Sequence, residues 1–151
     1  MVKKISSIVC LLLLMIISNN SFSQSGNVKE DDVVGIWLNQ EKDAKIQIYR
    51  DGDIFNGKLL WGDKNGHRAS DSKDKNNPNS KLRDRILKGI VLLKNFKFKD
   101  NTWSGGTIYD PKNGKTYKCV IKKDSDVKLE IRGYVGFSWL GKTTYWMRVE
   151  E

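Results

Sequence analysis

The chain has 151 residues, with 27 Lys and Arg against 18 Asp and Glu, and a formal net charge of +9. This length suits one domain with a single core. With one histidine and two cysteines, the chain offers neither a Ser-His-Asp set nor a Cys-His pair close in sequence. It also lacks a phosphate-cradling glycine loop and a supported pair of catalytic carboxylates. We therefore expect a non-catalytic protein without a cofactor.

The N-terminus has the pattern of a secretory signal peptide, predicted over residues 1–23. Lys3 and Lys4 precede an apolar run over residues 5–17, and Ser21-Phe22-Ser23 supplies small residues for cleavage. The run is shorter than the roughly 20 residues that span a bilayer, so we expect no transmembrane segment after cleavage. The mature protein would be exported to the periplasm, the cell envelope or the medium.

Cleavage would change both the charge and the cysteine content. Loss of Lys3 and Lys4 lowers the net charge from +9 to +7, and loss of Cys10 leaves Cys119 alone. An intramolecular disulfide is then impossible, so stability must come from the core. Cys119 lies in an alternating segment, which favours a buried, small apolar role over a nucleophile.

After a flexible lead-in over residues 24–32, the apolar pattern has a period of two, which indicates strands in a domain over residues 33–151. Gly35-Ile36-Trp37 opens the first strand, and an Asp-Gly turn over residues 50–53 joins the next two in a hairpin. The predicted strand segments from this hairpin onward are residues 44–49, 54–61, 86–93, 96–98, 103–109, 115–122, 127–132 and 143–149.

A polar loop over residues 62–81 interrupts this series. Such a long loop in a compact domain is often functional. It is either a lid or mouth loop anchored by Asp74, Asn77 and Arg83, or a plain solvated loop. Its acidic residues lack the spacing of a calcium-binding EF-hand, so we expect no metal site.

Eight or nine short strands in nearest-neighbour order favour an all-β fold, a single antiparallel up-and-down β-barrel of about eight strands. A β-sandwich is the alternative. The Gly-x-Trp at Trp37 and the arginine at Arg148 resemble the closure signature of the calycins, the lipocalin-like barrels. That resemblance implies that the arginine lies over the indole ring, in a structural role.

Several longer stretches resemble the exported bacterial family called domain of unknown function 2147. The resemblance runs from Asp32 to Val149, and its most specific parts are GGTIYDPKNGKTYKC and LEIRGYVGFSWLG. It implies a calycin-like barrel in the envelope but no activity and no functional residues.

Candidate site residues follow from the predicted barrel. Trp61, Trp103 and Trp139, with Phe137, would line an apolar cavity or simply fill the core. Arg132 is near a predicted mouth formed by residues 62–85 and 133–141, where a guanidinium would hold a carboxylate or phosphate. The predicted ligand-binding set is Trp61, Asp74, Asn77, Arg83, Trp103, Arg132 and Trp139.

Two functions remain open at this point. One is binding of a small apolar or amphipathic molecule, such as a lipid, inside the barrel. The other is an envelope interaction or structural role for a packed barrel whose basic surface meets anionic envelope components. The lysines are spread along the chain without clustered aromatic platforms, so we do not expect nucleic acid as a partner.

Overall fold

The computed structural model of the chain describes residues 27–64, 67–68 and 72–150, so the predicted signal peptide lies outside the described residues. The described chain is built from strands and three short 3-10 helices, η1 (Glu30–Val33), η3 (Ser80–Leu82) and η4 (Ser138–Leu140). Its strands are β1 (Gly35–Leu38), β2 (Ala44–Asp51), β3 (Ile54–Lys64), β4 (His67–Arg68), β5 (Val91–Lys99), β6 (Thr102–Asp110), β7 (Lys115–Ser125), β8 (Lys128–Tyr134) and β9 (Lys142–Val149).

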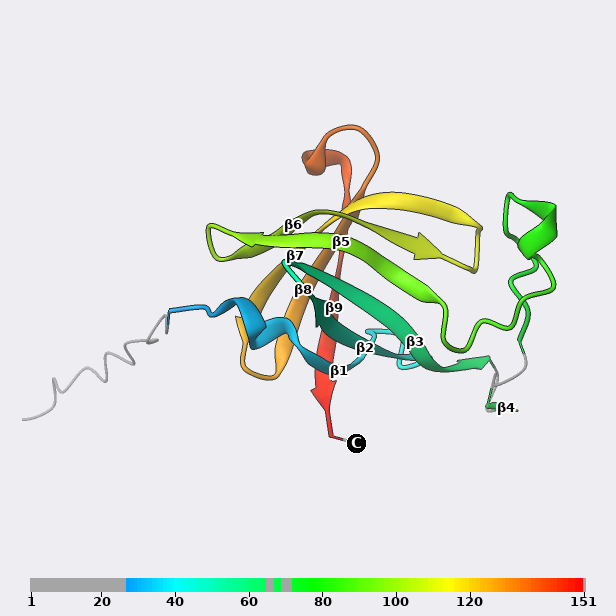
Figure 1. The fold of residues 1–151 in the computed structure, drawn as a ribbon, viewed down its shortest axis with the longest axis horizontal. Coiled ribbons are helices and arrows are strands. Elements are labelled where there is room, and N and C mark those ends of the chain that lie inside the picture. Colours follow the sequence, from blue (N-terminus) through cyan, green and yellow to red (C-terminus); the bar gives the residue numbers. More distant parts are fainter. Residues whose placement is uncertain (1–26, 65–66, 69–71, 151) are drawn as a thin grey trace, which may run out of the picture.

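The strands form one closed antiparallel ring (Figure 1). Neighbours along the chain pair with each other, β1 pairs with β9, and β2 pairs with both β1 and β3. The short β4 pairs with the end of β3, outside the ring. Eight strands therefore close the barrel, which confirms the predicted fold over the sandwich alternative.

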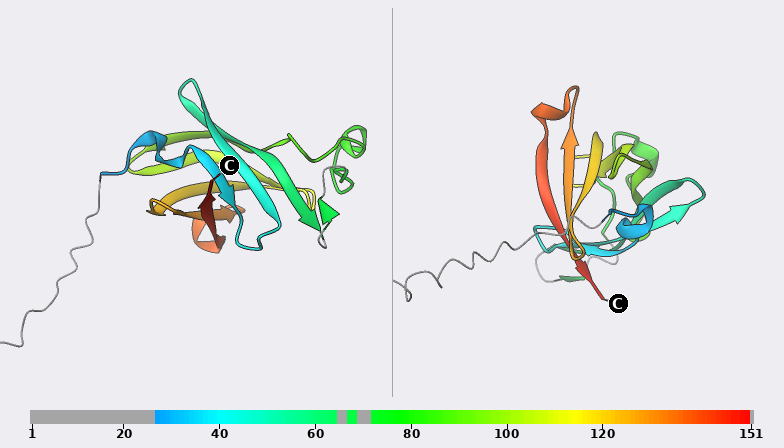
Figure 2. Two further views of the ribbon diagram at one scale, coloured as in Figure 1. Left: turned by 90° about the horizontal axis from the view of Figure 1, so that it is seen from below. Right: turned by 90° about the vertical axis from the view of Figure 1, so that its left-hand side faces the viewer.

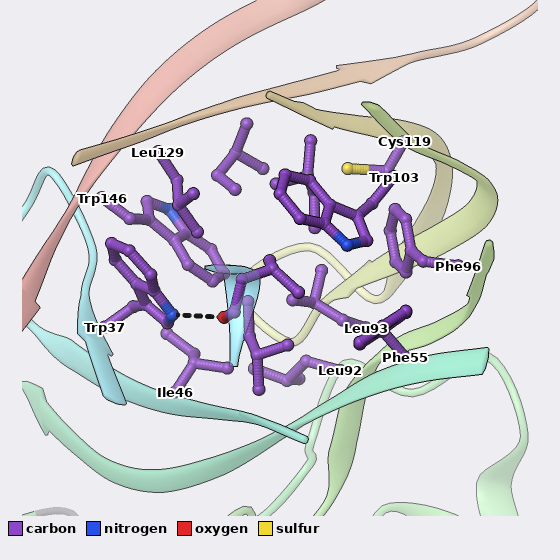
Figure 3. Packing of buried hydrophobic residues seen from close by; sticks show 14 of the residues in the cluster. Trp37, Ile46, Phe55, Leu92, Leu93, Phe96, Trp103, Cys119, Leu129 and Trp146 are labelled. Atoms are coloured by element: carbon purple, nitrogen blue, oxygen red, sulfur yellow. Dashed lines mark hydrogen bonds between the residues drawn. The ribbon is translucent and has the colours of Figure 1, made fainter. Parts of the chain in front are cut away.

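Large apolar side chains fill the interior (Figure 3). Trp37, Phe55, Phe96 and Trp103 are at most 2% exposed and lie in the barrel interior, on different strands. Other buried members of this core are Val33, Ile46, Ile48, Leu59, Leu92, Leu93, Cys119, Ile121, Leu129, Ile131 and Trp146. Burial of side chains from all around the ring is the main source of stability in such a fold.

Two glycines allow β3, β5 and β6 to approach closely. A Cβ atom on Gly57 would lie 2.8 Å from Cδ1 of Leu93, and one on Gly106 would lie 2.5 Å from Cδ2 of Phe96. A larger residue at either position would force Leu93 or Phe96 to move. Glycines at such positions provide the tight bends that a small closed barrel requires.

The structure shifts some predicted boundaries. The strand predicted over residues 86–93 begins at Val91, and the separate segment 96–98 is the continuation of β5. A bulge around Asn95, whose φ is 62°, keeps these residues in one bent strand. Upstream, residues 86–90 form turns, and Ile86 makes an isolated bridge to Lys73. The loop predicted over 62–81 contains the end of β3, β4 and the start of η3.

Candidate functional site

One end of the barrel is closed by η1, whose Val33 is fully buried against the core. Two indole rings bind its carbonyls from inside the barrel. Nε1 of Trp37 donates to the carbonyl of Val33 at 2.9 Å, and Nε1 of Trp103 donates to that of Glu30 at 2.8 Å. The helix is therefore a built-in floor, and it straddles the predicted boundary between lead-in and domain.

Arg148 ties this floor to the last strand. Its guanidinium carbon lies 4.2 Å from the centroid of the Trp37 ring. Its nitrogens donate to the carbonyls of Asp32 at 2.6 Å, Val34 at 2.9 Å and Asp126 at 3.0 Å. The arginine thus binds η1, the start of β1 and the β7–β8 turn at the same time.

An ion pair adds to the same end. Nζ of Lys123 lies 2.7 Å from Oδ2 of Asp32, with both side chains largely buried. This hydrogen bond from Lys123 is the largest cause of the lowered pKa of Asp32. These contacts together fix η1 at this end of the barrel.

The opposite end of the barrel carries the β1–β2, β3–β5, β6–β7 and β8–β9 connections, because neighbouring strands alternate in direction. The β1–β2 and β6–β7 turns are half a ring apart in strand order. Nζ of Lys112 nevertheless lies 2.6 Å from Oδ2 of Asp43, so the two turns meet. This hydrogen bond raises the pKa of Lys112. Charged groups therefore form the rim of this end, called here the mouth.

Below the rim, several interior positions are only half-buried. Ala44 and Ile108 pack against the core without being fully covered. A Cβ atom on Gly133 would lie 3.7 Å from Cγ2 of Ile108 and 3.7 Å from Cβ of Tyr117, so the three residues face one another. This apolar cluster under a polar rim contrasts with the filled interior nearer η1.

The loop over residues 72–87 is organised by Asp74, which is fully buried. Its Oδ1 accepts a hydrogen bond from the Tyr109 hydroxyl at 2.5 Å. Its Oδ2 accepts from Asn77 at 2.7 Å and from the Arg85 guanidinium at 2.7 and 2.9 Å. Arg83 in turn donates to the carbonyl of Asn77 at 2.8 Å. The three predicted anchors Asp74, Asn77 and Arg83 therefore lie together, around a carboxylate that binds the loop to β6.

These contacts shift the pKa values of the two partners in opposite directions. Burial favours the neutral carboxyl, but hydrogen bonds from Tyr109, Asn77 and Arg85 outweigh it and lower the pKa of Asp74. Burial, with the hydrogen bond to Asp74, raises the pKa of Tyr109 to about 12. At neutral pH the pair is thus an ionised carboxylate with a protonated phenol.

A second contact fastens the loop to the β6–β7 turn. The side-chain nitrogen of Asn76 donates to the carbonyls of Pro111 at 3.1 Å and Lys112 at 3.0 Å. Gly114 is buried below it, with a φ of 72°, and a Cβ atom there would lie 1.8 Å from the Asn76 carbonyl oxygen. The loop is consequently docked on one side of the mouth.

The other predicted ligand-binding residues lie elsewhere. Trp103 is in the core near η1, and the side chain of Trp61 is outside the described part of the structure. Arg132 binds the β8–β9 connection, where Trp139 is 71% exposed. The six predicted residues whose side chains are described thus lie in separate places: Asp74, Asn77 and Arg83 in the loop, Trp103 in the core, and Arg132 and Trp139 at the β8–β9 connection.

Two residues of the loop anchor, Arg85 and Tyr109, are not among the predicted site residues. Tyr109 is the last residue of a strand predicted over residues 103–109, and no motif singles out Arg85. They lie 11 and 35 positions after Asp74. No local motif links residues at such separations, so only the fold reveals the cluster.

The structure offers little for catalysis at Cys119. Its thiol is 1% exposed, and burial raises its pKa to about 12. A protonated, buried thiol is a poor nucleophile. Within the described ranges, no group of three or more His, Cys, Asp and Glu is placed to hold a metal ion. Nor does any helix in those ranges have the length and apolarity to cross a membrane.

Comparison with known proteins agrees with this fold. The family model described as "Uncharacterized protein conserved in bacteria (DUF2147)" matches residues 35–148. A solved structure of protein HP1028 from the human pathogen Helicobacter pylori, described as belonging to the lipocalin family, is similar with a TM-score of 0.71 and 31% identity. The alignment covers 83% of this chain and 86% of that one. No curated protein matches the chain. By its match over nearly the whole barrel and by its closed, lipocalin-like fold, the chain belongs to the DUF2147 family.

Proposed function

We propose that this protein is a non-catalytic, exported binding protein that takes a small apolar or amphipathic molecule at the mouth of its barrel. The observation that carries the proposal is the difference between the two ends of the barrel. At one end, η1 and its bonds to Trp37, Trp103 and Arg148 form a floor. At the other, half-buried Ile108, Tyr117 and Gly133 lie below a charged rim.

The filling of the interior limits the size of the ligand. Trp37, Phe55, Phe96 and Trp103 occupy the space that a deep ligand would need. An eight-stranded barrel holds either side chains or one small ligand in a given layer. We therefore expect a ligand whose apolar end contacts the half-buried Ile108, Tyr117 and Gly133 and whose polar end contacts the rim.

The rim has the chemistry for such a polar end. Lys112 and Asp43 form an ion pair there, and Nδ2 of Asn39 donates to Oδ1 of the same carboxylate at 2.7 Å. If a ligand separates this ion pair, an anionic headgroup can bind Lys112 and a cationic headgroup can bind Asp43. Ligand pockets commonly combine an apolar lining with a few such polar groups.

A second candidate is an envelope interaction protein with a packed barrel that works through its basic surface. The tightly filled core favours it, because the core gives the fold its stability without a ligand. The two candidates differ in whether the isolated protein holds a ligand.

Native mass spectrometry of the protein purified from its own host separates them. If the protein binds a ligand, we expect a fraction of it to carry an additional lipid-sized mass. This fraction should increase after incubation with a lipid extract of that host. A bare mass under both conditions would overturn ligand binding and favour the surface role.

A further inference from the structure

The β8–β9 connection holds a group of large apolar side chains in solvent. Val135, Phe137, Trp139 and Leu140 are 68%, 68%, 71% and 62% exposed. We call these four residues the apolar tip. It projects from the barrel body, as seen for the orange segment with η4 in Figure 1 and in the right-hand view of Figure 2. Exposed apolar groups of this kind mark interaction sites.

The tip is held in shape by Arg132. Its Nε donates to the carbonyl of Ser138 at 2.7 Å, and another nitrogen donates to that of Trp139 at 3.2 Å. A third bond, at 2.7 Å to Oγ1 of Thr143, fixes the guanidinium on β9. Gly136 has a φ of 71°, which suits glycine. The connection is therefore preorganised with its apolar side chains outward.

The two aromatic residues of the tip form one surface. The rings of Phe137 and Trp139 are stacked, with centroids 6.1 Å apart and planes 16° from parallel. Despite this stacking, both side chains remain about two-thirds exposed to solvent. Trp is enriched at membrane–water interfaces, where its amphipathic ring lies at the level of the lipid headgroups.

Basic residues flank the base of the tip. Lys142 pairs with Gly133 across β8 and β9, and Lys118 pairs with Tyr134 across β7 and β8. From Lys118, the row of paired residues continues to Thr107 on β6 and then to Lys94 on β5. All three lysines are exposed. An apolar end with cations behind it is the arrangement that binds anionic membrane surfaces.

We propose that the apolar tip inserts into the headgroup region of an anionic lipid bilayer, with Lys118 and Lys142 bound to lipid phosphates. The tip belongs to the same end of the barrel as the mouth, because the β8–β9 connection lies there. Insertion would turn the mouth toward the membrane. The tip lies outside the barrel, so this inference stands without the proposed ligand.

A second copy of the chain fits the tip less well. A stable protein interface buries about 800 Å² on each partner. Four side chains on one turn offer less than that, and a contact between two tips would bring their flanking lysines together. A bilayer needs no large complementary surface and supplies the opposite charge.

The test is co-sedimentation of the protein with vesicles of phosphatidylcholine, alone or mixed with phosphatidylglycerol. We expect binding to the mixed vesicles, weakened by added salt. The double variant Phe137→Ser/Trp139→Ser should lower the partition coefficient by about tenfold or more, since two large side chains no longer leave water. Lys118→Gln/Lys142→Gln should lower it by about fivefold for each lysine.

Matched variants at the closed end of the barrel serve as controls. Val127→Ser removes an apolar side chain that is 54% exposed in the β7–β8 turn, and Lys97→Gln/Lys99→Gln removes two exposed lysines of β5. Both should bind mixed vesicles within about twofold of the parent protein, because the predicted insertion does not involve that end. Circular dichroism of each variant checks that it is folded.

Three outcomes would overturn the inference. The first is no binding of the parent protein to the mixed vesicles. The second is equal loss in tip and control variants, which would indicate a general charge effect. The third is unchanged binding of Phe137→Ser/Trp139→Ser, which would show that the tip stays in water. Each can occur whether or not native mass spectrometry finds a ligand, so the two proposals fail separately.

Discussion

The Arg148 guanidinium stacks on the Trp37 ring at 4.2 Å, and the two residues are also direct partners in the pairing of β9 with β1. One contact thereby joins the last strand to the first. The same guanidinium binds the carbonyl of Asp32 in η1 and that of Val34 just after it, so closure of the ring and attachment of η1 depend on the same side chain.

Loss of Arg148 should therefore destabilise the whole barrel. Arg148→Ala removes three hydrogen bonds and a cation–π contact, which together stabilise by about 2–4 kcal/mol. Trp37→Ala leaves a large void and should cost about 3–5 kcal/mol. Thermal and urea unfolding measure both changes. Arg50→Ala, which breaks exposed ion pairs with Glu30 and Asp31 of η1, is the control and should change stability little. Unchanged melting temperatures for Arg148→Ala and Trp37→Ala would contradict the structural role.

Asp74 should control the loop more than the barrel. Asp74→Ala leaves Tyr109, Asn77 and Arg85 without their acceptor, so opening of residues 72–87 should become easier by about 2–4 kcal/mol. Limited trypsin digestion, with cleavage sites mapped by mass, should show cuts after Arg83 and Arg85 at least about tenfold faster. Asp84→Ala, which removes an exposed partner of Lys73, is the matched control. Equal digestion of the two variants would contradict the anchor.

The Asp74–Tyr109 pair predicts loss of loop protection at both ends of the pH range. The folded pKa of Asp74 is below its unfolded value of 3.8, so its contribution is present above that pH and is lost as the pH falls through the folded pKa. The folded pKa of Tyr109 is about 12 against 10.0, so its contribution is present below pH 10 and is lost as the pH approaches 12. Hydrogen exchange of the loop amides should follow this profile. In Tyr109→Phe the alkaline loss should disappear, and its persistence would point to another group.

A pair of glycine substitutions tests the docking of the loop on the β6–β7 turn. Gly52 and Gly114 have φ values of 60° and 72°, so alanine strains the backbone at both positions. That strain costs about 1 kcal/mol or somewhat more. Only Gly114→Ala also drives a Cβ atom into the Asn76 carbonyl, while Gly52 has nothing within 4 Å. Thermal unfolding should therefore show the larger loss for Gly114→Ala, with faster cleavage of the loop. A larger loss for Gly52→Ala would argue against close docking.

The Cys119 thiol should react only when the barrel opens. It is 1% exposed, with a pKa raised to about 12 by burial. Labelling by a thiol reagent, located at Cys119 by peptide mass, should be negligible in the native protein. In increasing urea it should rise together with the unfolding transition. Rapid labelling without urea would contradict the packed interior.

The strands were predictable because their signals are local in the sequence. Period-two alternation predicted the hairpin of β2 and β3 and the strands β6, β7 and β8 within a few residues. Trp37 and Arg148 could be paired by their resemblance to a known closure. Segments such as 86–90 were mistaken for strand because apolar residues that pack beneath a loop look the same in sequence as those of a strand.

Other features depended on contacts between distant residues. The acidic residues of η1 suggested a solvated lead-in, but its carbonyls are bound by Trp103 and Arg148, which lie far along the chain. Trp103 and Trp139 were both assigned to a cavity wall, yet one is 0% and the other 71% exposed. Residue type alone does not distinguish a core indole from one on a projecting turn.

Ligand binding at the mouth is tested most directly by native mass spectrometry of the parent protein and of Gly133→Leu, each incubated with the same lipid extract of the host. A Cβ atom fits at Gly133 with contacts of 3.7 Å, so the longer side chain should cover Ile108 and Tyr117 without displacing backbone. We expect an added lipid-sized mass on the parent protein and its loss in a Gly133→Leu protein that melts cooperatively. Equal added mass on both proteins, or none on the parent, would contradict binding at the mouth.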